Sequence, residues 1–463
     1  MPVNRGRLWA VLIIVVGVLV AAVVVAVLVG GSDGPDTTPV TSGSAGGTAV
    51  RKTAAAGPDG DGGTVAWTTD TKTGSWTAEV VGDTAVLLDG TALLGLNVAD
   101  GSRRWRLPYA SKDTTFVVAG AMVVVQQGND GPLDVIEPAT GRIAWSTAGP
   151  ARMVARADAL YLDPCPRRPG PDDSCVTVKR RVTDGATLWS VKDPGFFLQD
   201  NVIGGRSPLA PAATAYLPVT TSAKGPARGA LLDTASGRLL AGRIAPHAWY
   251  LLAAGHTLVA TDHDPAPGDD DCTVRVDAVD AVTGKPAWHG AVYSGRKANG
   301  ECAKQLSSAY SGTVLLGSGS DVAAVSRNGR ATLTDVTTGK VRWTAAEPGV
   351  PIAGDDRSLL VRDNAETGPI ALLDLATGRK LWAAPDPGLP GSSASWAAVV
   401  AGDLVAVMGA TGDRPYVLVY DARTGRLLAR RGGWLTGIGD GWVMVSTTVG
   451  AGAGGLKVQM LRF

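Results

Sequence analysis

The stretch Asp335-Val-Thr-Thr-Gly339-Lys-Val-Arg-Trp343 returns 39 residues later as Asp374-Leu-Ala-Thr-Gly378-Arg-Lys-Leu-Trp382. An acid or its substitute, a turn with glycine, and tryptophan four residues after that glycine also occur at 97–105, 137–145, 181–189 and 280–288. Two further copies keep the turn but end in Ala241 and Ala429. The eight copies are 40, 44, 52, 47, 55, 39 and 47 residues apart. Repetition at this period predicts a propeller or a solenoid.

Each repeat unit contains four short apolar runs separated by turn residues, as in residues 350–382. Four strands per unit is the composition of a propeller blade. The repeated turn suits a tight hairpin between the third and fourth strands, because its glycine adopts positive φ without steric cost. No window after residue 30 keeps a helical apolar period over three turns without glycine or proline. The expected fold class is therefore all-β: a single β-propeller of four-stranded blades.

The two ends of the repeat region are expected to share one blade. Trp67 follows Gly63 and Asp59 at the spacing of the repeat, so the residues around it predict a fourth strand from the N-terminal side. The C-terminal runs 441–445 and 456–461 have no fourth strand of their own. A shared blade would leave no free sheet edge. We expect eight blades, with nine as the alternative.

The motif Asp-x-x-Thr-Gly-x-x-x-Trp resembles the tryptophan-docking motif of the pyrroloquinoline-quinone-like β-propeller repeat family, within the quinoprotein dehydrogenase-like superfamily. The resemblance covers nearly all of the chain from about residue 64 onward. It implies that the tryptophan packs between adjacent blades, and that Ala241 and Ala429 depart from this pattern. The docking position is held by Trp67, Trp105, Trp145, Trp189, Trp288, Trp343 and Trp382.

The first sixty residues predict a membrane anchor and a tether. Residues 8–29 are 22 uncharged, mostly apolar residues, and a helix of that length spans a bilayer. Arg5 and Arg7 precede this segment and Asp33 and Asp36 follow it, so residues 1–7 are expected in the cytoplasm. A cleaved signal peptide is the alternative. Residues 30–63 are expected to form a flexible linker, and residues 64–463 an extracytoplasmic propeller on a single-pass cell-membrane protein.

Composition bears on partners and on the cysteines. The 43 Lys and Arg residues almost balance 42 Asp and Glu residues, so no basic field favours nucleic acid as a partner. Four cysteines in an oxidising compartment predict disulfides. We expect Cys165 to pair with Cys175 across a proline-rich loop, and Cys272 with Cys302, with free buried thiols as the alternative.

Candidate catalytic and metal-binding motifs are weak. The four histidines fall in one repeat unit beside an acidic loop, residues 262–271, where a solvated loop is expected and a divalent cation is the alternative. The glycine-rich run 450–455 lies between predicted strands and is not followed by a helix, so we interpret it as a loop and not as a nucleotide-binding motif. No nucleophile elbow or Walker sequence occurs. We therefore assign no catalytic, cofactor-binding or metal-binding residue and expect no cofactor.

The expected function is a membrane-anchored, extracytoplasmic, non-catalytic binding or scaffold module for a protein or a cell-envelope polymer. One alternative is a sensor ectodomain that works with a signalling partner. A quinone-dependent dehydrogenase is the other alternative. The resemblance implies two adjacent cysteines near the cofactor in such enzymes, whereas no two cysteines are neighbours in this sequence.

Overall fold

The computed structural model divides into two compact units, Met1–Ala56 and Gly57–Phe463. The residues it describes all belong to the second unit and are 63–71, 78–109, 113–128, 131–147, 152–163, 176–192, 195–198, 215–221, 228–244, 250–261, 271–296, 313–315, 322–327, 330–335, 337–363, 368–388, 398–411, 414–449 and 455–463. In these ranges no helix is long and apolar enough to cross a membrane. The predicted anchor at residues 8–29 lies outside them.

The described residues of the second unit are all-β. Five sheets hold four consecutive strands each: β2 Ala78–Val81, β3 Thr84–Asp89, β4 Ala92–Asn97 and β5 Arg103–Pro108; β6 Thr115–Ala119, β7 Met122–Gln126, β8 Leu133–Ile136 and β9 Ile143–Ser146; β10 Arg152–Arg156, β11 Ala159–Asp163, β12 Val176–Arg181 and β13 Thr187–Lys192; β25 Val350–Gly354, β26 Ser358–Arg362, β27 Ile370–Asp374 and β28 Lys380–Ala384; β29 Ala398–Ala401, β30 Leu404–Thr411, β31 Arg414–Asp421 and β32 Leu427–Gly432.

Three sheets depart from that pattern. One has three strands: β14 Phe196–Leu198, β15 Tyr216–Thr221 and β16 Gly229–Asp233. One has eight: β17 Tyr250–Ala254, β18 Thr257–Thr261, β19 Asp271–Asp280, β20 Pro286–Arg296, β21 Thr313–Leu315, β22 Val322–Arg327, β23 Arg330–Asp335 and β24 Val341–Thr344. The last joins both ends of the repeat region: β1 Thr64–Thr71, β35 Gly455–Arg462, β34 Trp442–Val449 and β33 Trp434–Gly439.

The eight-stranded sheet consists of two antiparallel units, β17–β20 and β21–β24, joined by the single parallel bridge Tyr293↔Ser326. The described strands therefore form eight sheets and nine repeat units. The blade number, expected to be eight with nine as the alternative, depends on whether this sheet is counted once or twice.

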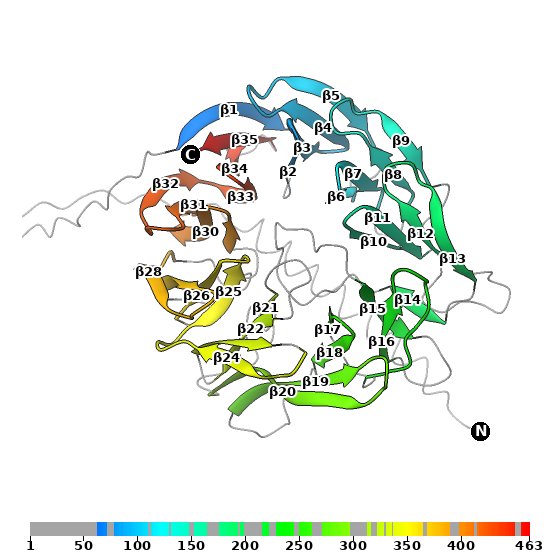
Figure 1. The fold of residues 1–463 in the computed structure, drawn as a ribbon. Helices are drawn as coiled ribbons and strands as arrows, with labels where there is room; N and C mark the ends of the chain where they lie inside the picture. The colour runs from blue at the N-terminus through cyan, green and yellow to red at the C-terminus, as the bar shows by residue number, and fades with distance from the viewer. Residues whose placement is uncertain are drawn as a thin grey trace, which may run out of the picture. The chain divides into compact units, whose positions relative to one another are not determined.

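The sheets follow one another around a ring, with β2, β6 and β10 toward its centre and β5, β9 and β13 at its periphery (Figure 1). The middle strands are apolar and buried, as in β7, whereas the outermost strands are largely exposed, as in β9. Clusters of buried aliphatic side chains lie between neighbouring sheets, for example Val86 and Leu93 of one sheet with Val123 and Val125 of the next. Burial of this apolar surface between sheets stabilises the ring.

Closure of the ring agrees with the expectation from sequence. Strand β1 pairs antiparallel with β35, and Thr64 lies opposite Arg462. Both ends of the repeat region thus contribute to one sheet, whose strand β33 contacts β2 of the following sheet. The red and blue ends of the ribbon meet there in Figure 1.

Because neighbouring strands of a sheet are antiparallel, their connections lie at two opposite ends of the strands. We name these two ends the "turn edge" and the "loop edge"; neither name refers to an unpaired outer strand. The "turn edge" carries the connections from first to second strand and from third to fourth strand, including the repeated glycine turns. The "loop edge" carries the connections from second to third strand and from each sheet to the next. The facing ends of β11 and β12, and those of β18 and β19, therefore lie on the same edge as the C-terminal end of β20 and the N-terminal end of β21.

Candidate interaction surfaces and the junctions that position them

Tryptophans connect each sheet to the turn of the following sheet. The indole Nε1 donates to the carbonyl oxygen one residue after the acid position of the next unit, at 2.7–2.9 Å, in six cases: Trp67 to Val98, Trp105 to Pro138, Trp145 to Val182, Trp189 to Thr234, Trp343 to Leu375 and Trp382 to Ala422. Trp288 lies against Gly339 in the same way that the others lie against their turn glycines.

The turn glycines make room for these rings. A Cβ atom at Gly425 would lie 2.6 Å from Cγ of Trp382, and one at Gly101 would lie 2.7 Å from Cγ of Trp67. Gly425 also has a φ of +70°, a conformation that side chains with a Cβ rarely adopt. The repeated glycine thus serves both the turn and the contact between sheets.

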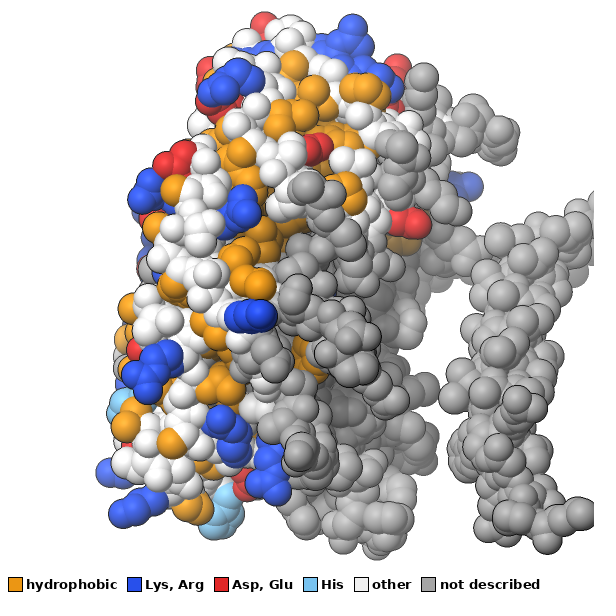
Figure 2. Space-filling view, turned by 90° about the vertical axis from the view of Figure 1, so that its right-hand side faces the viewer, with side chains coloured by type: hydrophobic (Ala, Val, Ile, Leu, Met, Phe, Trp, Pro, Cys, Tyr) orange, Lys and Arg blue, Asp and Glu red, His pale blue; other side chains and the backbone are white. Residues whose placement is uncertain are grey.

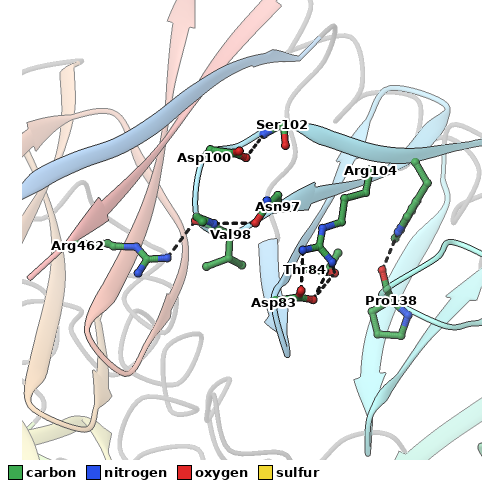
Figure 3. Close-up of polar contacts among 11 residues, drawn as sticks. Asp83, Thr84, Asn97, Val98, Asp100, Ser102, Arg104, Pro138 and Arg462 are labelled. Carbon is green, nitrogen blue, oxygen red and sulfur yellow. Dashed lines mark hydrogen bonds and ion pairs between the residues drawn. The ribbon is translucent and has the colours of Figure 1, made fainter.

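Figure 3 shows the junction that follows the closing sheet. The Val98 carbonyl accepts a second hydrogen bond, from Arg462 Nη2 at 3.1 Å. On the next sheet, Arg104 donates to both carboxylate oxygens of Asp83, at 2.8 and 2.6 Å. Arg104 lowers the pKa of Asp83 below its ordinary value, but the carboxylate is exposed and the pair contributes little to stability.

The acid of the repeat caps its own turn, as Asp335 illustrates. Its Oδ1 accepts from the Thr337 hydroxyl at 2.7 Å and from the Thr338 N–H at 3.0 Å, and its Oδ2 accepts from Arg342 at 3.1 Å. The Thr337 hydroxyl, followed by Arg342 and Thr338, holds the pKa of Asp335 well below its ordinary value of 3.8. The carboxylate form is therefore stabilised in the folded chain.

Asp335→Asn is expected to make the stability of the chain less sensitive to acid. A lowered pKa adds stability above the unfolded value near 3.8, and this contribution is lost as the pH falls through the folded value. The stability difference between the parent and Asp335→Asn should therefore shrink between pH 7 and pH 3. Urea midpoints at both pH values test this, and a constant difference would contradict it.

The sheet that ends in Ala241 differs from the expected four strands. Its fourth strand is reduced to the bridges Leu232↔Leu239 and Gly229↔Ile244. Between these bridges the Gly242 N–H donates to the Ala281 carbonyl at 2.7 Å, the carbonyl position that indole groups reach elsewhere. Arg243 Nη1 donates to the Gly242 carbonyl at 2.8 Å. A backbone amide thus replaces the missing tryptophan, which requires the strand to bulge.

Gly242→Ala is expected to destabilise the chain by about 1–3 kcal/mol through overpacking. The added Cβ would lie 2.6 Å from Cα of Ala281, a backbone atom that cannot rotate away. Gly432→Ala is the matched control, since a Cβ there meets nothing within 4 Å. Equal urea midpoints for the two variants would refute the close contact at Ala281.

The sheet that carries Ala429 precedes the closing sheet, where β35 and β1 are not joined by a hairpin. In the preceding sheet, Ala422 follows the acid of the repeat, and its N–H donates to the Asp403 carbonyl at 2.8 Å. The Phe463 N–H donates to the Gly441 carbonyl at 3.1 Å in the same way, so Phe463 occupies the equivalent position in the closing sheet. A Cβ at Gly63 would lie 2.7 Å from the Phe463 ring, and Arg431 donates to the Gly63 carbonyl at 3.2 Å. Gly63 thus occupies the place that a turn glycine has in the other sheets, and the Phe463 ring lies against it.

Two clusters of polar side chains lie at the loop-edge ends of the strands. Arg362 is fully buried and donates to Asp386 at 2.8 Å. Asp134 is buried and accepts from Ser146 Oγ at 2.5 Å. Burial, followed by the nearby Asp134 charge, raises the pKa of Tyr109 above its ordinary value. These clusters hold the ends of strands where the connections between sheets begin.

The outer surface of the ring combines exposed aliphatic and basic side chains. Figure 2 shows a band of hydrophobic side chains along one side of the molecule, with Lys and Arg on and beside it. The outermost strands supply exposed aliphatic residues at Val65, Ile143, Leu188, Val341 and Leu381.

The candidate metal and disulfide residues are mostly outside the described ranges. His256 and His289 belong to the unit β17–β20, and His256 Nδ1 lies 3.4 Å from Asp280. His247, His263, Cys165, Cys175 and Cys302 lie outside the described residues, and Cys272 is placed only by its backbone in β19. In the part of the chain that is described, no group of three His, Cys, Asp or Glu residues could hold a metal ion. The two disulfides stay predictions, as does the solvated loop at 262–271, for which a divalent cation was the alternative.

A family model described as "Outer membrane protein assembly factor BamB" matches residues 51–164, 181–384 and 273–433. The chain belongs to this family of pyrroloquinoline-quinone-like β-propellers. The match extends through the turns and tryptophans described above. For this BamB-like propeller, a comparison with curated proteins gives no match.

Solved structures similar to this BamB-like propeller share little sequence with it. BamB from Moraxella catarrhalis is 14% identical, with 87% of this chain and 100% of that chain covered and a TM-score of 0.39. A europium-containing methanol dehydrogenase is 13% identical, with 87% and 93% covered and a TM-score of 0.39. Sqt1 from Saccharomyces cerevisiae is 11% identical, with 87% and 100% covered and a TM-score of 0.40.

The resemblance to the quinoprotein dehydrogenase-like superfamily implies two neighbouring cysteines beside the cofactor in its quinone-dependent members. The sequence contains no neighbouring cysteines, and the described residues bring together no metal-ligand cluster. These residues do not fit the quinone cofactor.

Proposed function

We propose that this chain is a membrane-anchored, extracytoplasmic, non-catalytic propeller whose loop edge binds a protein or a cell-envelope polymer. The contrast between the two edges carries the proposal. On the turn edge, the connections between third and fourth strands are of nearly constant length, from 98–102 to 422–426. On the loop edge, connections range from the single residue 433 to the segment 297–312. Variable connections on a rigid scaffold are typical of binding surfaces.

Two connections between first and second strands on the turn edge are longer than the others: 316–321 between β21 and β22, and, longest of all, the one between β14 and β15. Residues 199–215 join β14 to β15, whereas the equivalent connections in neighbouring sheets are 157–158 and 255–256. The longest connection belongs to the same sheet that has lost its fourth strand. On the loop edge, the length of the connections varies all around the ring. We therefore place the binding surface there.

The proposed anchor is compatible with this orientation. The N-terminal segment enters the ring at Gly63, next to Thr64, which pairs with Arg462 at the turn edge. An anchor at residues 8–29 would therefore be connected to the turn edge through the linker, and the loop edge lies on the opposite side of the sheets.

Site-directed photo-crosslinking in intact membranes tests the proposal. A photoreactive amino acid would replace exposed residues of the loop edge, such as Lys192 and Arg228, or of the turn edge, such as Val282 and Thr338. We expect specific adducts from the loop-edge positions only. Adducts from the turn edge alone, or quinone-dependent dye reduction by the purified chain, would contradict the proposed function.

A further inference from the structure

Two arginines and a tyrosine form a basic shelf between the sheets β25–β28 and β29–β32. Arg414 and Tyr416 are alternate residues of β31, so they share one face of that strand. Leu418 of β31 pairs with Arg430 of β32, which places Arg430 on the same face. We call Arg414, Tyr416 and Arg430 the "arginine shelf". It faces the preceding sheet, since Tyr420 on the same face stacks with Trp382 at 5.6 Å.

The Tyr416 ring of the shelf is fixed by a hydrogen bond to the connection after β28. The Tyr416 hydroxyl donates to the Pro387 carbonyl at 2.5 Å. Gly409 leaves space for this contact, because a Cβ there would lie 2.2 Å from the Pro387 oxygen and 2.5 Å from the Tyr416 ring. The residue before Pro387 is Asp386, which is bound to the buried Arg362. The ring therefore rests on a connection that is itself fixed.

The guanidinium of Arg430 lies over this ring, 4.2 Å from its centroid. Such stacking orders a side chain that is otherwise flexible and leaves its N–H groups available to a ligand. Arg430 and Arg414 are both exposed, and neither forms an ion pair with another described residue. Asp386, the carboxylate of the connection that carries Pro387, is paired with Arg362 at 2.8 Å. Asp413, next to Arg414 in the sequence, lies outside the described residues.

We propose that the arginine shelf binds an acidic peptide segment of a partner protein. This inference rests on the proposed binding function and specifies a ligand for it. An arginine pairs with a carboxylate through two parallel hydrogen bonds. Arg430 lies opposite Leu418, four residues along β31 from Arg414, so the two arginines are spaced by about 13 Å, the distance between residues four apart in an extended peptide. Tyrosine and arginine are also, with tryptophan, the residue types enriched among those that carry most of the protein–protein binding energy.

Fluorescence anisotropy with a labelled hexaglutamate peptide tests the site on the full chain in detergent micelles. Arg430→Gln is expected to weaken binding about tenfold and Arg414→Gln about threefold. The matched control is Arg106→Gln, which removes an exposed arginine from the outermost strand of another sheet. It should stay within about twofold of the parent, since it leaves the shelf intact. Tyr416→Phe keeps the ring but loses the bond to Pro387, so an intermediate loss is expected.

Several results would overturn the inference. Equal weakening by Arg106→Gln and Arg430→Gln would show diffuse attraction rather than a site. Failure of hexaglutamate to bind, together with binding of poly(glycerol phosphate) that depends on Arg430, would exclude the peptide in favour of a phosphate polymer. Unchanged unfolding midpoints establish that the variants are folded. Loop-edge crosslinks that persist in Arg430→Gln would leave the proposed function standing while the shelf fails.

Discussion

Trp382→Ala is expected to lower the free energy of unfolding by about 4 kcal/mol, because it removes a large buried side chain and leaves a cavity. Trp382 is 8% exposed, stacks with Tyr420 and donates to the Ala422 carbonyl at 2.8 Å. Its ring also covers Gly425. The variant thus loses contacts within its own junction and one hydrogen bond, which leaves the Ala422 carbonyl without its indole donor.

Urea unfolding of the full chain measures this effect, and two variants divide it into parts. Trp382→Phe keeps an aromatic ring but removes the N–H, so we expect a loss of about 1 kcal/mol from the hydrogen bond, with an additional packing loss. Trp343→Ala removes a partly exposed tryptophan from the preceding junction, so the loss should be smaller than for Trp382→Ala. A Trp382→Ala midpoint that equals the parent's would refute the docking role.

Gly425→Ala is expected to destabilise the chain by about 3–4 kcal/mol, as the sum of backbone strain and overpacking. The φ of Gly425 is +70°. The new Cβ would also lie 2.6 Å from Cγ of the Trp382 ring. The ring cannot move aside without breaking its bond to Ala422.

Gly82→Ala separates the two causes of this loss. Gly82 has a similar φ of +61°, but a Cβ there meets nothing within 4 Å. It should therefore cost only the backbone strain, about 1–2 kcal/mol. The difference between the two variants measures the contact between sheets. Equal losses at Gly82 and Gly425 would mean that the tryptophan contact contributes nothing.

The repeat in the sequence was sufficient to predict the four-stranded pattern that most sheets follow, the repeated turns and the shared closing sheet. The spacing from Asp374 to Trp382 is local, and a turn glycine with a capping acid forms wherever the same residues recur. The spacing of Gly63 and Trp67 likewise predicted the fourth strand of the closing sheet, which β1 provides.

The two junctions without tryptophan were beyond sequence reasoning. Ala241 and Ala429 look alike in the repeat, yet one junction uses the Gly242 amide and the other places Phe463 against Gly63. The reduced fourth strand after β16 was not expected either, because the pattern around Leu239 still reads as a strand. Each solution depends on atoms of the following sheet, which the local sequence does not contain.

The arginine shelf was missed for the same reason. Arg414, Tyr416 and Arg430 belong to no motif, and only the pairing of β31 with β32 brings them onto one face. The order of the shelf further depends on Pro387, a residue of the connection that follows β28 of the neighbouring sheet. A sequence signal was available in the alternation of Arg414 and Tyr416, but their partners are separated from them by 14 to 29 residues.

By itself, the sequence determined the fold class, the repeat and the closing strand, because these follow from local hydrogen bonding and from apolar runs that must be buried. Only the tertiary structure decided how each junction is completed and which charged side chains gather on one surface. Contacts between sheets join atoms about 30 to 40 residues apart in most tryptophan junctions, and their geometry depends on both sheets being in place.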